Sequence, residues 1–199
     1  MEFDFTPEQA EFRRSVVAFC EKEIVPIAAR CDASGEFPLH LFPLMGKLGY
    51  LGVKFPPEYG GAGEGNVTYA ILAEELGRAS AGIALGFYVH VALALTAIAA
   101  FGTPAQKERY LRPGIAGEKI GAWGFAEPGA GSDPGSITCR AEKTPAGYRI
   151  TGTKMFITNS PFADFVVLTA STARGPSHTM AMMGLEVMKR TRPGKKGFP

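Results

Sequence analysis

The sequence predicts an α+β protein, with an all-α helical bundle in residues 1–117 and an antiparallel β domain in residues 118–199. Two observations predict this division. Apolar residues recur at helical spacing in the first half, and short segments of alternating polar and apolar residues, separated by turns, follow it. The chain has 199 residues, of which 46% are hydrophobic, so it can bury one sizeable core or two small ones.

The first helix is predicted to begin after Thr6, within the stretch TPEQ. This stretch reads as a capping box with proline at the first helical position: the Thr6 hydroxyl accepts from the Gln9 amide, and the Gln9 side chain reaches back. Helical spacing of apolar residues carries the helix to about Ala33, and Pro26 is the expected point of a kink.

Three further helices are predicted over residues 39–48, 67–77 and 81–102, the second of them capped by Asn66. The segment 81–102 has no charged residue over 22 positions, which is long enough to span a bilayer. It is a solitary apolar segment in an otherwise amphipathic chain. We therefore predict a fully buried helix of a bundle, and no membrane span.

A second capping box, at Thr103 to Gln106, predicts a last helix that ends near Leu111, because Arg112-Pro113-Gly114 follows as a breaker. Earlier in the chain, residues 56–63 are rich in proline and glycine and are predicted to form a loop.

The β domain is predicted to begin with a strand over residues 120–125. Ile137, Cys139 and Ala141 then alternate with polar residues, as in a half-buried strand. A turn at residues 144–147 leads to further strands. These are predicted over residues 148–151, 154–158 and 165–170.

The three cysteines are Cys20, Cys31 and Cys139; their spacing fits neither a disulfide framework nor a metal site, so we expect free, mostly buried thiols in a reducing compartment. The N-terminus lacks the features of a secretory signal, which favours the cytoplasm or an organelle matrix. Net charge is +2, with six basic residues against one acid in residues 171–199. We interpret this basic end as a solvated strand and tail, since no aromatic residues are interleaved for nucleic-acid stacking.

The loop GFAEPGAGSDPG, residues 124–135, combines small and polar residues. Its glycine spacing does not match a dinucleotide-binding turn, and the lysine of a phosphate-binding loop is absent. Glycines here let backbone amides approach a flat ligand closely. Residues 154–160 add an aromatic ring, Phe156, and a hydroxyl, Thr158; the alternative is that these two are an ordinary core phenylalanine and an edge threonine.

These motifs resemble the acyl-CoA dehydrogenase family of flavoproteins. The resemblance is carried by GFAEPGAGSDPGS and GYRITGTKMFITNS, with FTPEQAEFRRSV, PPEYGGAG, AEELGRAS and FGTPAQKERYL in the same order before them. It extends from about Phe3 to Ser171. It implies α,β-dehydrogenation of an acyl-CoA thioester on FAD, with electrons passed to an electron-transferring flavoprotein, and a homo-oligomer that is usually a tetramer.

The resemblance also assigns site residues. Those implied to contact FAD are Trp123, Phe125, Ala126, Gly131, Ser132, Phe156, Ile157 and Thr158. Those implied to contact the substrate are Ser132, Val89 and Leu93. Two positions depart from the family, which often has a hydroxyl residue at the position of Ala126 and usually tryptophan at that of Phe156.

No catalytic base is assigned, because both base positions of the family lie beyond Pro199. Glu74 and Glu75 are interpreted as helix-surface charges, and Glu127 matches a structural position of its motif. Family members are longer than this chain and carry a further helical domain, so we expect the 199-residue chain to be inactive alone.

Two alternatives remain open from the sequence. One is a non-catalytic short chain that binds flavin, acyl-CoA or a partner protein. The other is an acyl-CoA oxidase or a flavin monooxygenase of the same architecture.

Overall fold

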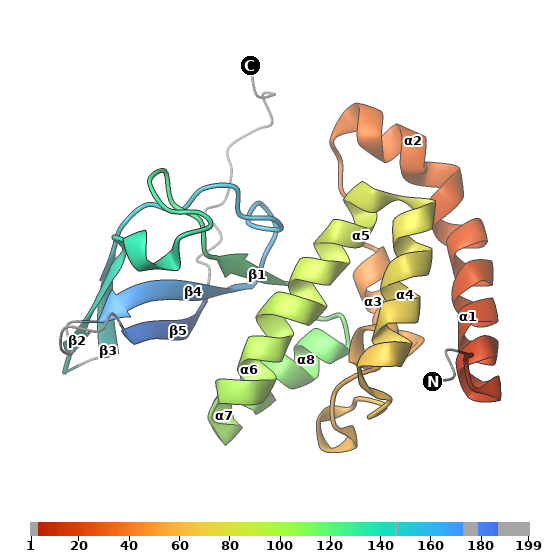
Figure 1. Cartoon of the computed structure of the whole chain (residues 1–199), viewed down its shortest axis with the longest axis horizontal. Coiled ribbons are helices and arrows are strands. Elements are labelled where there is room, and N and C mark those ends of the chain that lie inside the picture. Colours follow the sequence, from red (N-terminus) through yellow and green to blue (C-terminus); the bar gives the residue numbers. More distant parts are fainter. Residues whose placement is uncertain (1–3, 146, 173–178, 187–199) are drawn as a thin grey trace.

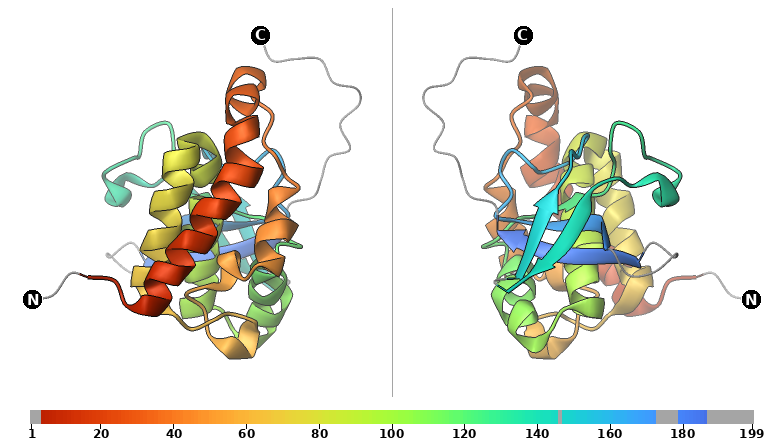
Figure 2. Two further views of the ribbon diagram at one scale, coloured as in Figure 1. Left: turned by 90° about the vertical axis from the view of Figure 1, so that its right-hand side faces the viewer. Right: turned by 90° about the vertical axis from the view of Figure 1, so that its left-hand side faces the viewer.

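The computed structural model describes residues 4–145, 147–172 and 179–186. A bundle of helices comes first in the chain, and a sheet lies beside it (Figure 1). The right-hand view of Figure 2 looks onto the strands, with the helices behind them. The predicted order, helices and then strands, is confirmed.

The first long helix consists of α1 (Pro7–Phe19), the π-helical turn η1 (Cys20–Ile24) and α2 (Val25–Ser34). Its capping box is confirmed, because the Gln9 amide donates to Thr6 Oγ1 at 3.2 Å and the Thr6 amide donates to Gln9 Oε1 at 3.1 Å. Pro26 stands in the first turn of α2, directly after the wider π turn. The helix ends at Gly35, whose φ of 67° is left-handed.

The next elements are α3 (Leu41–Lys47), the 3₁₀ turns η2 (Tyr50–Gly52) and η3 (Pro57–Tyr59), and α4 (Gly65–Ala79). The predicted cap of α4 is wrong, since Asn66 lies inside the helix and Glu64 precedes it without a side-chain capping bond. The loop prediction for residues 56–63 is confirmed apart from the short turn η3.

The apolar segment forms α5 (Ala81–Tyr88), the π-helical η4 (Val89–Leu95) and α6 (Thr96–Phe101). By length and composition it could cross a membrane, but 50% of its most apolar window is buried inside the protein. The prediction of full burial is wrong, because Leu85, Tyr88 and Phe101 are exposed. The other helices cover only part of this one. It packs against α4, against residues 107–115 and against the first strand, β1 (Gly121–Gly124).

The predicted break at residues 112–114 is also wrong. The helix continues through α7 (Pro104–Gln106), η5 (Lys107–Leu111) and α8 (Arg112–Ile115). Pro113 has no N–H to donate to the carbonyl of Arg109, four residues earlier. Lys119 Nζ donates to that carbonyl at 3.2 Å instead, so the proline leaves no unpaired acceptor there.

The strands are β1 (Gly121–Gly124), β2 (Arg140–Thr144), β3 (Gly147–Thr151), β4 (Phe165–Thr172) and β5 (Thr179–Glu186). The sheet is mixed and not wholly antiparallel: β4 pairs in parallel with β1 and β2, whereas the β2–β3 and β4–β5 pairs are antiparallel. Because β4 lies between β1 and β2 in the sheet, the chain passes over β2 after it leaves β3, and residues 152–164 form this connection.

The strand predicted over residues 154–158 is wrong, because this segment is a loop inside that connection. Gly152, Phe156 and Asn159 all have positive φ, which no regular strand accommodates. The predicted burial of Ile137, Cys139 and Ala141 is confirmed. The basic residues Arg174, Lys189, Arg190, Arg192, Lys195 and Lys196 lie outside the described residues.

Candidate functional site

Two segments of the β part, both singled out from the sequence, lie against each other. One is the loop that leaves β1, residues 125–133, and the other is residues 154–160. The Met155 amide donates to the Ala126 carbonyl at 3.0 Å, and Lys154 Nζ donates to the Phe125 carbonyl at 2.8 Å. Residues almost thirty positions apart in the sequence therefore form one surface.

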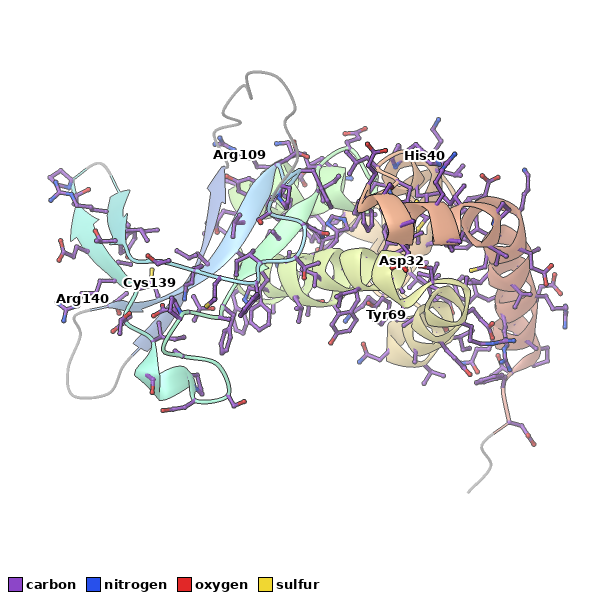
Figure 3. All side chains as sticks on the ribbon, turned by 90° about the horizontal axis from the view of Figure 1, so that it is seen from above. Asp32, His40, Tyr69, Arg109, Cys139 and Arg140 are labelled. Carbon is purple, nitrogen blue, oxygen red and sulfur yellow. The ribbon has the colours of Figure 1, made fainter. Side chains whose placement is uncertain are left out.

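Glu127 is the centre of this arrangement. Its carboxylate accepts from the Thr138 amide at 2.7 Å, the Thr138 hydroxyl at 2.7 Å, the Cys139 amide at 3.0 Å and Lys154 Nζ at 2.8 Å. Both side chains of the ion pair are buried, with 9% of Lys154 and 2% of Glu127 exposed. Cys139, labelled in Figure 3, marks the place where the loop meets β2.

These donors set the protonation state of Glu127. Burial acts to raise the pKa of the carboxyl, but hydrogen bonds from Lys154, Thr138 and the backbone outweigh it and lower the pKa to about 2. A carboxylate that weakly basic, with four donors already in place, is a poor proton acceptor. These contacts agree with the interpretation of Glu127 as a structural residue.

The other two acidic candidates differ from each other. Glu74 is a surface charge as predicted, with 55% of its side chain exposed. Glu75 is not, because only 3% of it is exposed and it accepts from Arg13 Nε at 2.6 Å and from Arg78 at 2.7 Å. The pair with Arg13 ties α1 to α4, so Glu75 has a structural partner that lies 62 residues away.

The glycine loop presents open backbone. A Cβ placed on Gly129 or Gly131 would meet no heavy atom within 4 Å, and Ser132 is exposed. Within the described residues, no backbone hydrogen bond engages the amides of Gly131 and Ser132. Asp133 closes the loop by accepting from the Gly135 amide at 2.9 Å, and its hydrogen bond from Ser136 lowers the pKa of its carboxyl.

Aromatic side chains flank this loop. The rings of Trp123 and Phe125 lie with centroids 5.0 Å apart, and Trp123 Nε1 is buried without a hydrogen-bond partner among the described residues. Phe156 is 87% exposed, so it is not a core residue. Its φ of 55° is strained for a bulky side chain. Ile157 and Thr158 follow it, both half-buried.

The helical part contains a cavity of about 260 Å³ between α4 and α5. Its lining is almost wholly apolar and includes Tyr69, Leu72, Leu76, Ala84, Leu85 and Tyr88. Tyr69 projects from α4 (labelled in Figure 3), and burial raises the pKa of its hydroxyl far above the ordinary value. Neither Val89 nor Leu93 belongs to this lining: Val89 is buried in the domain core, and Leu93 is half-buried. Their contact with substrate stays a prediction.

Sequence reasoning missed Lys154 and the tyrosines of the cavity. An isolated lysine in a polar segment carries no signal that its ammonium is buried. The one hint was Glu127 in the loop of residues 124–135, because an acid that becomes buried requires a cation or several hydrogen-bond donors. Among the described residues, no group of three or more His, Cys, Asp or Glu side chains is placed to hold a metal ion.

Comparison with known proteins agrees with this geometry. Residues 6–118 match the model of the acyl-CoA dehydrogenase N-terminal domain, and residues 122–196 match that of the acyl-CoA dehydrogenase middle domain. A probable acyl-CoA dehydrogenase of Bacillus subtilis, YngJ, is 40% identical over 174 residues, which are 87% of this chain and 46% of that protein.

Two solved structures show the same fold. Butyryl-CoA dehydrogenase from Megasphaera elsdenii superposes with a TM-score of 0.87 at 34% identity, covering 96% of this chain and 51% of that one. A glutaryl-CoA dehydrogenase from Mycobacterium smegmatis, solved in complex with FADH2, has a TM-score of 0.86 at 28% identity and covers 92% and 46%. The chain spans about half the length of the relatives it matches, and on both domain matches it belongs to the acyl-CoA dehydrogenase family.

Proposed function

We propose that this chain is part of an FAD-dependent acyl-CoA dehydrogenase, which oxidises an acyl-CoA thioester to the 2-enoyl-CoA and passes the electrons to an electron-transferring flavoprotein. The observation that carries the proposal is the surface formed by residues 125–133 and 154–160. It combines open glycine amides with an exposed aromatic ring, and it is locked by a buried ion pair.

The residues present fit a flavin. A flat ring system needs an apolar surface, hydrogen-bond donors at its edge and room beside the backbone. Phe156 supplies exposed aromatic surface, and Gly131 supplies open backbone. The buried Trp123 Nε1 is a donor for which the described part of the chain offers no acceptor. The residues that would hold FAD are Trp123, Phe125, Ala126, Gly131, Ser132, Phe156, Ile157 and Thr158.

Bound FAD would supply the hydride acceptor for the dehydrogenation. The chain's own groups bind and orient. The amides and hydroxyl near Ser132 are donors for a flavin or thioester oxygen, and such hydrogen bonds to the thioester carbonyl acidify the α-carbon. Ala126 offers no hydroxyl, and its carbonyl already accepts from Met155.

The apolar cavity between α4 and α5 suits the hydrocarbon part of an acyl group, because its lining buries methylenes and offers almost no polar partner. Glu75 and Glu127 are both held in ion pairs. Neither is therefore assigned the removal of the α-proton, and we propose that the base lies outside residues 1–199.

The test is flavin retention by the 199-residue chain. FAD is added, free flavin is removed by gel filtration, and the protein peak is examined for the flavin absorption band. Phe156→Ala should lower retention, whereas Phe101→Ala, which removes another exposed phenylalanine at the end of α6, should not. Equal retention by both variants would contradict the assigned surface.

The activity proposal has its own assay. We expect no steady reduction of an electron acceptor by the isolated chain with any acyl-CoA. Turnover by the chain alone would overturn the assignment of the base. Hydrogen peroxide formation by a protein that contains this chain would favour an oxidase.

A further inference from the structure

Strand β1 begins at a residue whose two backbone polar groups are both held by side chains. The Gly121 amide donates to His90 Nδ1 at 3.0 Å, and the Gly121 carbonyl accepts from Asn159 Nδ2 at 3.1 Å. His90 belongs to η4 of the helical part, and Asn159 belongs to the connection before β4. Three elements that are distant in sequence therefore meet at one residue.

Each of the two side chains also has a second partner. His90 Nε2 lies 3.0 Å from the Gly114 carbonyl, and Asn159 Nδ2 also donates to the Gly86 carbonyl at 2.8 Å. A carbonyl only accepts, so Nε2 carries the hydrogen and Nδ1 is the acceptor. His90 is thus a neutral imidazole in one tautomer, and burial, which lowers its pKa to about 4, maintains that state near neutral pH.

The residues that make these hydrogen bonds are buried and closely packed. His90 is 0% and Asn159 is 4% exposed. A Cβ on Gly121 would lie 2.7 Å from Phe165 Cζ and 2.8 Å from Ala94 Cβ, so only glycine allows the strand to approach η4 this closely. Asn159 has a φ of 71°, a left-handed conformation that asparagine tolerates better than most residues.

The location of this cluster connects the features of the candidate site. Gly121 stands two residues before Trp123, and Asn159 directly follows Thr158. Gly86 and His90 flank Phe87 and Tyr88, two residues that line the apolar cavity. A displacement of any one of these three segments must therefore break a hydrogen bond of the cluster.

We propose that His90 and Asn159 are positioning residues, which form a clamp with Gly121. The clamp fixes the positions of three segments relative to one another: the helix α5–η4 beside the cavity, the loop of residues 125–133 and the segment of residues 154–160. The identity of the ligands rests on the proposed function, but the clamp is a property of this chain alone. Replacing a residue that only stabilises the core would destabilise the whole fold. Replacing a positioning residue would first loosen the segments that it holds.

The experiment compares Asn159→Ala with Asn66→Ala, the same change at an exposed asparagine, and His90→Leu with His40→Leu, the same change at an exposed histidine. Amide hydrogen exchange is measured at Gly121 and in α1 under native conditions. The fluorescence of Trp123, the only tryptophan of the chain, is quenched with acrylamide. Circular dichroism establishes that each variant is folded.

For the two clamp variants we expect exchange at Gly121 to be faster by about tenfold or more, the factor that corresponds to ~1.4 kcal/mol. We also expect stronger quenching of Trp123 and unchanged exchange in α1. Both control variants should match the unmodified chain. Equal acceleration at Gly121 and in α1, or no change at Gly121 in a folded Asn159→Ala protein, would overturn the proposal.

The unmodified chain supplies a test that needs no variant. If the clamp holds, the Gly121 amide exchanges as slowly as the core amides of β4, and rapid exchange at Gly121 in the folded chain would contradict it. Flavin retention is measured on the same samples. Its absence from the unmodified chain bears on the proposed function, whereas the exchange and quenching data decide the clamp.

Discussion

Replacing Glu127 by glutamine should destabilise the protein strongly. The change leaves the buried ammonium of Lys154 without its counter-charge, and it places an NH2 group, itself a donor, among the Thr138 and Cys139 amides and the Lys154 ammonium, which are also donors. Breaking a buried ion pair from one side costs about 3–5 kcal/mol. The pKa gives a second figure. The fall from the ordinary 4.5 to about 2 corresponds to roughly 3 kcal/mol at about 1.36 kcal/mol per pH unit.

The two free energies agree, and the one derived from the pKa depends on pH over a definite range. A carboxyl whose folded pKa is lowered stabilises the fold above its unfolded pKa, here near 4.5, and this contribution is lost as the pH falls toward 2. The difference in unfolding free energy between wild type and Glu127→Gln should therefore be about 3 kcal/mol near pH 7 and should shrink steadily below about pH 4.5.

The assay is urea unfolding followed by circular dichroism and Trp123 fluorescence at several pH values, with Glu74→Gln as the control at an exposed acid. The control should stay within about 0.5 kcal/mol of wild type. A Glu127→Gln protein as stable as wild type, or a difference that does not change with pH, would refute the assignment of Glu127 as a buried anion.

Three further outcomes follow from the contacts. Gly121→Ala should lower the free energy of unfolding by about 1–3 kcal/mol through overpacking, because the added Cβ would meet Phe165 and Ala94. In the matched variant Gly129→Ala the added Cβ faces open space, so the urea midpoint should be unchanged or slightly higher. Glu75→Gln should lower the melting temperature by removing a charge that two arginines share, at a cost of about 1–3 kcal/mol; an unchanged melting temperature would contradict the buried bridge. For His90, burial lowers the folded pKa from 6.5 to about 4, so the unfolded chain binds more protons in that interval and stability should decrease as the pH falls through it. His90→Leu should remove this slope in a pH series of urea midpoints, and a slope of equal size in the variant would show that other groups cause it.

Several features were predictable because their causes lie within a few residues. The capping box at Thr6 and that at Thr103 are each complete within four residues, and both form as expected. The alternation of Ile137, Cys139 and Ala141 is a local pattern, and all three are buried. The small residues of the loop after β1 predict an open backbone, and Gly129 and Gly131 do face open space; contact of this loop with a ligand stays a prediction.

Three of the wrong predictions failed because a contact outside the local pattern decides the structure. Pro113 does not end its helix, because Lys119 satisfies the carbonyl that the proline leaves unpaired. Glu75 is buried and not exposed, because Arg13 reaches it from another helix. The segment 154–158 has the composition of a strand, but Lys154 is drawn to Glu127 and Phe156 takes a left-handed conformation.

The sequence by itself determined where the two helices with capping boxes begin, after Thr6 and after Thr103. It also determined which strand face is buried and which family the chain belongs to, since these depend on short motifs and their order. Only the tertiary structure decided how the candidate site is held together. Lys154 binds Phe125 and Glu127 across 29 and 27 positions, and the hydrogen bonds of His90 and Asn159 to Gly121 and Gly86 join residues separated by 31, 38 and 73 positions. No local propensity encodes such pairs. They form because burial makes an unpaired polar group costly, and the packed elements offer each donor only a few acceptors within reach.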